Sequence, residues 1–158
     1  MPRSTTRTVC RAPGSPSTTP TPPVVAAAAS PSADPSSPLS ATPVGPYSPV
    51  ARAGDWLVVS GQVGVADGAL VEGGVEAQTA QALTNLAGLL AAEGASLANV
   101  VKTTVFLRHI WDFEAMNAVY AEAFGGHRPA RSTVGVASLP LDALVEIEAW
   151  AWTGDAGR

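Results

Sequence analysis

Proline is concentrated at one end of this chain, and its distribution limits where a folded domain can form. Residues 1–40 hold nine of the 14 prolines, fourteen Ser and Thr residues, one of the 15 glycines and no aromatic side chain. A segment of this composition buries too little apolar surface to offset the entropy lost on ordering. All four tryptophans, both tyrosines and all three phenylalanines follow residue 40. We therefore predict a disordered Pro/Ser/Thr/Ala-rich tail over residues 1–40 and one folded domain over residues 41–158.

The net charge of the two segments also differs. Residues 1–40 carry three Arg and one Asp, a net charge of +2, whereas residues 41–158 carry six basic and twelve acidic side chains, a net charge of −6. Binding to a phosphate backbone requires a basic surface, so nucleic acid is not the expected partner. The longest apolar run of the tail, residues 24–29, is far shorter than the ~20 residues of a membrane-spanning helix. No membrane association is expected.

The tail allows two interpretations of where the protein acts. Its three arginines among Ser, Thr and Ala are typical of an organelle transit peptide. Nine prolines oppose the amphipathic helix that such peptides form. The composition therefore favours a disordered extension, or a start codon assigned too far upstream, and a cytoplasmic protein. The single cysteine, Cys10, predicts no disulfide framework and no cysteine-based metal site.

Between residues 45 and 152 the sequence pattern alternates between strands and helices. Short β-branched runs next to Gly and Pro predict strands, and apolar residues spaced three and four apart predict amphipathic helices. The expected strands are residues 47–53, 56–63, 100–107, 131–136 and 144–152, and the expected helices are residues 75–93 and 113–124. Gly54-Asp55 and Asp67-Gly68 are turn signals, so the first two strands are expected to pair antiparallel. Asp112 is the expected N-cap of the second helix, whose buried stripe includes Phe113 and Tyr120.

This order of elements predicts an α+β domain in which one sheet carries both helices on one face. The strand 100–107 starts with two apolar residues and is expected to lie centrally in the sheet. The opposite sheet face has no cover within the chain. The strands are nevertheless apolar, as at Leu57, Val58, Val59, Val145, Ile147 and Trp150. We therefore expect that face to be buried against another subunit of a homo-oligomer.

Charged side chains occur at unexpected places in the last two strands. Arg131 opens a strand of otherwise small and apolar residues. Glu146 and Glu148 are two positions apart and point to the same strand face. On a buried face these groups would need partners, whereas on a solvated face they are ordinary surface charges, as residue statistics favour. The residues alone leave both alternatives open.

Six short motifs follow one another within residues 41–155. They are Gly45-Pro46-Tyr47-Ser48, Ser60-Gly61-Gln62, Glu76-Ala77-Gln78-Thr79, Asp112-Phe113 to Asn117-Ala118-Val119-Tyr120, Pro129-Ala130-Arg131-Ser132 and Val145-Glu146-Ile147-Glu148. In this order and spacing the chain resembles the reactive intermediate deaminases, the Rid or YjgF family of imine hydrolases. The resemblance implies a chorismate-mutase-like α+β fold, with a mostly antiparallel mixed sheet and two helices on one face, assembled as a homotrimer.

The resemblance also implies roles for individual residues. Arg131 matches the arginine that binds the carboxylate of a small 2-imino acid, and Glu146 matches the acid that positions or activates the attacking water. Water attack on the imine then releases ammonia and leaves a 2-oxo acid. The residues that match the substrate-binding pocket, between neighbouring subunits, are Tyr47, Ser60, Gly61, Asn117 and Thr133. No metal and no organic cofactor is implied.

Several of these assignments have a plainer alternative. Tyr47 also fits a core aromatic at a turn, and Asn117 a polar residue at the edge of the buried helix stripe. Many imine-hydrolysing members have a cysteine where this chain has Thr133, so a second hypothesis is a small-ligand-binding or chaperone-like protein without turnover. A ribonuclease is the weakest hypothesis because the domain is acidic. The leading prediction is a 2-iminobutanoate/2-iminopropanoate deaminase-like enzyme that acts on small 2-imino and enamine acids.

Overall fold

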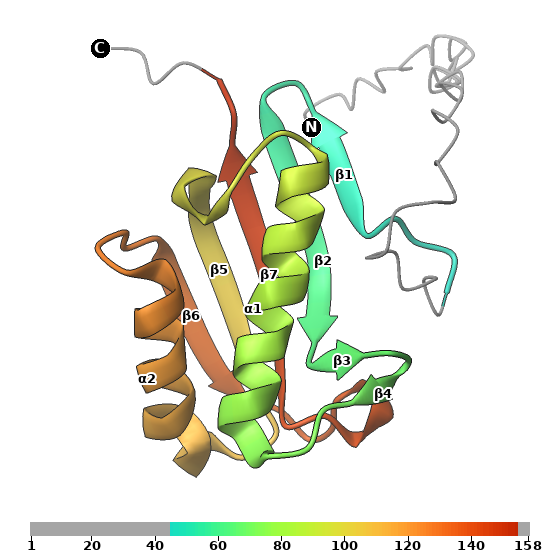
Figure 1. Cartoon of the computed structure of the whole chain (residues 1–158), viewed down its shortest axis with the longest axis vertical. Helices are drawn as coiled ribbons and strands as arrows, with labels where there is room; N and C mark the ends of the chain where they lie inside the picture. Colours follow the sequence, from blue (N-terminus) through green and yellow to red (C-terminus); the bar gives the residue numbers. More distant parts are fainter. Residues whose placement is uncertain (1–44, 155–158) are drawn as a thin grey trace, which may run out of the picture. The chain divides into compact units, whose positions relative to one another are not determined.

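The computed structural model describes residues 45–154, which form seven strands, two α-helices and three short 3-10 turns (Figure 1). The strands are β1 Val50–Ala53, β2 Trp56–Val63, β3 Val65–Ala66, β4 Ala69–Leu70, β5 Val100–Leu107, β6 Ala130–Gly135 and β7 Val145–Trp152. The helices are α1 Gly74–Ala92 and α2 Phe113–Phe124, and the turns are η1 Leu97–Asn99, η2 Ile110–Asp112 and η3 Pro140–Asp142. The predicted disordered tail, residues 1–40, lies outside the described residues.

Five strands form one sheet in the order β1-β2-β7-β5-β6, and β3 and β4 form a separate two-stranded hairpin. The pairs β1–β2, β2–β7 and β7–β5 are antiparallel, whereas β5 and β6 are parallel. The parallel pair arises because α2 returns the chain to the end of the sheet from which β5 started. The strand 100–107 lies inside the sheet as expected, although β7 occupies the middle position. The predicted α+β class, with a mixed and mostly antiparallel sheet, is confirmed.

Both helices pack on the same face of this sheet, as predicted (Figure 1). Side chains alternate between the two faces of a strand, so every second residue of β2, β5 and β7 meets the helices. The largest fully buried apolar side chains are Leu57, Val59, Leu86, Leu90, Val100, Val105, Leu107, Met116, Val145 and Ile147. Within residues 45–154, no helix is both long enough and apolar enough to cross a membrane.

The sheet face that carries no helix has a different composition from the one we expected. Leu57, Val59, Val145 and Ile147 point toward the helices and are buried there. The alternate residues of these strands point to the helix-free side and include three tryptophans. Trp56 is paired with Trp152, and Trp150 is paired with Val58. The Trp56 ring centroid lies 4.9 Å from that of Trp152 and 6.3 Å from that of Trp150. We call this helix-free side the open face. Its apolar part is the tryptophan patch of β2 and β7, whereas Glu146 and Glu148 of β7 lie farther along the same face. Four of the six residues named for it in the prediction lie on the other side.

Two details at the ends of elements differ from the prediction. The first strand starts at Val50 and not at Tyr47, since Pro49 has no N–H for a strand ladder and the Tyr47 N–H bonds to Gly45 O at 2.8 Å. Asp112 does precede α2, but its side chain makes no capping hydrogen bond. Asp112 ends the 3-10 turn η2 with φ −79° and ψ 3°, which is not the extended conformation of a capping residue.

Candidate active site

Arg131 lies near the start of the edge strand β6, on the face that carries the helices. The parallel register pairs it with Thr103 of β5, which is fully buried on that face. Its guanidinium contacts α2: Nη2 donates to Asn117 Oδ1 at 2.7 Å, and Cζ lies 4.6 Å from the centroid of the Tyr120 ring. The Phe113 ring centroid is 5.6 Å from Cζ. Residues four and three apart share one helix face, so α2 presents three neutral groups to one cation.

No carboxylate pairs with Arg131 in the part of the chain that the structure describes; the two ion pairs there involve other arginines. Thr133 lies two residues farther along β6, and its buried hydroxyl has no hydrogen-bond partner among residues 45–154. A half-buried guanidinium among neutral neighbours offers several further N–H donors to an anion. We call this group the arginine cluster: Phe113, Asn117, Tyr120, Arg131 and Thr133. Its chemistry fits the binding of a carboxylate.

Glu146 lies on the open face. It pairs with Phe106 of β5, three residues along from Thr103, so Glu146 and Arg131 are on opposite faces of the sheet. Partial burial raises the pKa of the Glu146 carboxyl above its ordinary value of 4.5, and the charge of Glu148 on the same face raises it further. A raised pKa increases the basicity of this carboxylate, which suits a group that takes a proton from water.

Gly61 of β2 has no side chain, and the Glu146 carboxylate occupies the space where a Cβ atom would lie. A Cβ atom on Gly61 would lie 1.8 Å from Glu146 Oε1, far inside van der Waals contact. The register between β2 and β7 shifts between Val59 and Gln62, which is the pattern of a β-bulge. Ser60 and Gly61 both lie within β2, in the strand expected over residues 56–63. Bulges are frequent beside active sites, where they re-aim a side chain.

Ser60 connects this part of β2 to the segment before β1. Its Oγ donates to Ser48 O at 2.7 Å, and its N–H bonds to Pro49 O at 2.9 Å. Tyr47 precedes Ser48 and is 52% exposed, so the alternative that it is a core aromatic is wrong. We call the four predicted site residues of this region the glutamate cluster: Tyr47, Ser60, Gly61 and Glu146.

The seven predicted site residues therefore form two groups, and their charged members, Arg131 and Glu146, lie on opposite sheet faces. Sequence reasoning missed two members of the arginine cluster, since Phe113 and Tyr120 fitted the buried stripe of a helix. Tyr120 is buried, but Phe113 is 38% exposed, and both rings lie near the guanidinium. In the sequence, Phe113 lies four residues before Asn117 and Tyr120 lies three residues after it, which places all three on one helix face. This spacing is the signal that could have identified them.

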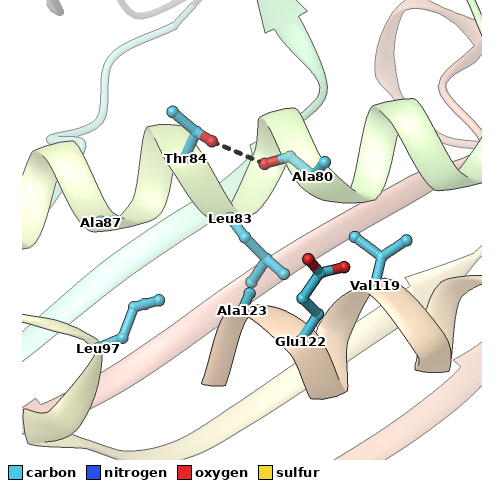
Figure 2. A pocket seen from close by; sticks show the side chains of 8 residues that line it. All are labelled: Ala80, Leu83, Thr84, Ala87, Leu97, Val119, Glu122 and Ala123. Carbon is cyan, nitrogen blue, oxygen red and sulfur yellow. Dashed lines mark hydrogen bonds between the residues drawn. The ribbon is translucent and has the colours of Figure 1, made fainter. Parts of the chain in front are cut away.

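A groove between α1 and α2 is a separate concave surface (Figure 2). It measures about 360 Å³, and small and aliphatic side chains from both helices line most of it. Glu122 is its one charged residue, and the Thr84 hydroxyl already bonds to Ala80 O at 2.9 Å. None of the seven predicted site residues lines this groove. Because it offers no cation, it does not fit an anionic substrate.

Comparison with known proteins identifies the family to which this chain belongs. A family model described as endoribonuclease L-PSP matches residues 38–153. A RutC family protein of Pyrococcus horikoshii is 46% identical, over 70% of this chain and 89% of that protein. The crystal structure of YyfA from Yersinia pestis, of the conserved Rid protein family, has a TM-score of 0.70 and 39% identity over 73% of this chain and 94% of that chain. This chain belongs to the Rid family.

Membership of the Rid family confirms the resemblance drawn from the six motifs. The match over residues 38–153 spans every residue of the arginine and glutamate clusters. Among Rid relatives, a Capra hircus protein named 2-iminobutanoate/2-iminopropanoate deaminase is 46% identical, over 70% of this chain and 82% of that protein.

Proposed function

We propose that this protein hydrolyses small 2-imino and enamine acids to 2-oxo acids and ammonia. The observation that carries the proposal is the Arg131 guanidinium, half-buried among neutral partners, with the Thr133 hydroxyl, which has no partner among residues 45–154, two residues along the same strand. In a 2-imino acid the carboxylate is bonded directly to the imine carbon. A guanidinium that binds this carboxylate with two parallel hydrogen bonds therefore fixes the position of the reacting carbon.

The reaction requires water and one proton acceptor. Water adds to the electrophilic imine carbon, the C–N bond breaks, nitrogen leaves as ammonia, and a C=O bond remains, so one water is consumed and no electron is transferred. We assign Glu146 as the base that accepts the proton of the attacking water. An enamine first takes a proton at carbon to become the imine.

Arg131 and Glu146 lie on opposite sheet faces, so one chain does not offer both groups to one substrate. We propose that the site is completed in a homotrimer, where the arginine cluster of one subunit meets the glutamate cluster of the next. A closed ring of this kind joins two different surfaces of neighbouring subunits. The tryptophan patch of the open face, where Trp56 is 38% and Trp150 49% exposed, supports burial against another copy.

The assay that tests the proposed activity uses 2-iminobutanoate made in place by an amino-acid oxidase. Semicarbazide traps the imine that has not been hydrolysed, so an active protein lowers the yield of semicarbazone. Binding of 2-oxobutanoate without any loss of semicarbazone would instead support the ligand-binding hypothesis. The ribonuclease named in the family description is not favoured, because residues 41–158 carry a net charge of −6.

We expect Gly61→Ala to lower kcat for imine hydrolysis by about 10- to 100-fold with little loss of stability. The new Cβ would collide with the flexible end of the Glu146 side chain, so the carboxylate moves and the backbone does not. Gly61 has no positive φ, so alanine fits its backbone conformation. The check is kcat together with the thermal midpoint.

Gly126→Ala is the matched control, since no atom lies within 4 Å of its added Cβ, and it should leave kcat unchanged. The double variant Gly61→Ala, Glu146→Gln should be no slower than Glu146→Gln alone, because both changes remove the same carboxylate. A Gly61→Ala protein with wild-type kcat would contradict the assigned place of Glu146.

A further inference from the structure

A hydrogen-bonded pair, Tyr120 and Thr103, lies next to Arg131. The Tyr120 hydroxyl and Thr103 Oγ1 are 2.7 Å apart, and the two residues are 6% and 0% exposed. Thr103 is also the register partner of Arg131 across the parallel strands β5 and β6. The pair therefore joins α2 to the sheet beside the position from which Arg131 extends.

This pair is a polar contact on an otherwise aliphatic surface. The other buried residues of β5 are Val100, Val105 and Leu107. Valine at position 103 would fill nearly the same volume without a hydroxyl to desolvate, so packing alone does not account for threonine. A paired hydroxyl has a different effect, because it restricts the tilt and height of the Tyr120 ring over the sheet.

The orientation of the Tyr120 ring matters because its face lies against the guanidinium. Arg131 Cζ is 4.6 Å from the Tyr120 ring centroid, while Nη2 bonds to Asn117 Oδ1 at 2.7 Å. The guanidinium is thus held at its face by a ring and at one edge by an amide. Its other N–H groups remain for a ligand. A planar fork binds a carboxylate in its own plane, so a tilted ring would misalign it.

We propose that Thr103 and Tyr120 are positioning residues whose hydrogen bond sets the orientation in which Arg131 meets the substrate carboxylate. This inference rests on the proposed function. Both hydroxyls are buried between α2 and β5, so they act through Arg131 and not on the substrate. Thr103→Val and Tyr120→Phe each remove the hydrogen bond while keeping most of the packing.

Each of these variants should raise KM for 2-iminobutanoate by about 5- to 20-fold, with kcat changed by less than about twofold. The double variant should be no worse than either single variant, since one bond is lost in all three. Thr103→Ser keeps a hydroxyl and should restore KM. The matched control is Thr79→Val, which removes an equally buried hydroxyl, bonded to Val75 O at 2.6 Å on α1, and should leave KM unchanged.

A second readout makes the test independent of turnover. The Nε–Hε NMR signal of Arg131, identified by its loss in Arg131→Lys, reports the order of the guanidinium. It should shift and broaden in Thr103→Val and Tyr120→Phe but not in Thr79→Val. An unchanged signal in both test variants, or an unchanged KM, would overturn the proposal. If wild-type protein does not hydrolyse the imine, the deaminase function fails, and the Arg131 signal alone then decides whether the pair positions the guanidinium.

Discussion

Arg131→Ala is expected to lower kcat/KM for 2-iminobutanoate by about 1,000-fold in a protein that stays folded. Two charge-assisted hydrogen bonds to a carboxylate contribute roughly 1.5–3 kcal/mol each, and every 1.4 kcal/mol is about tenfold. The fold tolerates the change because Arg131 is only partly buried, on an edge strand, and its loss frees a single acceptor, Asn117 Oδ1. Imine trapping measures the rate, and circular dichroism measures the thermal midpoint.

Two further arginine variants separate charge from geometry. Arg131→Lys keeps the charge but loses the planar fork, so its kcat/KM should fall by about 10- to 100-fold. Arg128→Ala is the control, because this exposed arginine lies three residues away and bonds only to the backbone carbonyls of Gly125 and His127 among residues 45–154. It should keep wild-type activity. An Arg131→Ala protein with near-wild-type kcat/KM would rule out the carboxylate-binding role.

Glu146→Gln is expected to lower kcat by about 100- to 1,000-fold and to leave KM nearly unchanged. The variant keeps the shape of the side chain but removes the proton acceptor, while Arg131 still binds the carboxylate on the other side of the site. Steady-state kinetics with the imine trap separates the two constants. A rise in KM at constant kcat would instead show that Glu146 binds the substrate.

The pH dependence of kcat/KM for the wild-type enzyme gives a second test of the role of Glu146. Because its pKa lies above 4.5, kcat/KM should decrease as the pH falls through that raised value. Glu148→Gln removes the neighbouring negative charge, so the acid limb should move to lower pH while the plateau stays the same. An acid limb that does not move in Glu148→Gln would contradict the coupling of the two carboxyls.

The same raised pKa predicts an effect on stability. A carboxyl whose folded-state pKa is raised stabilises the fold below its unfolded pKa, and this contribution is lost as the pH rises through the folded-state pKa. Within one subunit the ionised Glu146 is therefore unfavourable at neutral pH, and Glu146→Gln should melt at a higher temperature than wild type when both are compared as separated subunits. Below pH 4.5 this advantage should vanish. Such an exchange of stability for activity is common at functional sites.

The helices and strands could be predicted because apolar residues recur in each at a regular spacing. Apolar residues three and four apart indicated both helices, and β-branched runs between turn residues indicated the strands. The orientation of the sheet faces could not be predicted in the same way. Both faces of β2 are apolar: Leu57 and Val59 point to one face, and Trp56 and Val58 point to the other. Hydrophobicity alone therefore does not decide which pair meets the helices. Packing decides it, since the aliphatic set fits against α1.

The resemblance supplied the site residues but not their division into two clusters. Arg131 meets Asn117 only because α2 folds back beside β6, and Gly61 meets Glu146 only because a register shift in β2 brings them together. Neither local propensity nor spacing predicts such a shift. One indication in the sequence that Thr103 is unusual is its hydroxyl among the aliphatic residues of its strand. Its hydrogen-bond partner, Tyr120 of α2, could not be predicted because tertiary packing brings the two together.

The most direct test of the account asks whether Arg131 and Glu146 act from different subunits. Arg131→Ala and Glu146→Gln chains with different affinity tags are produced together, and assemblies that hold both are purified and measured for imine hydrolysis. Light scattering should give the mass of three 16.0 kDa chains. In a mixed ring of three, one neighbour contact joins an intact Arg131 to an intact Glu146, so about one third of wild-type activity should return. Mixed trimers that stay as inactive as either parent, beside an active wild type, would contradict the shared site.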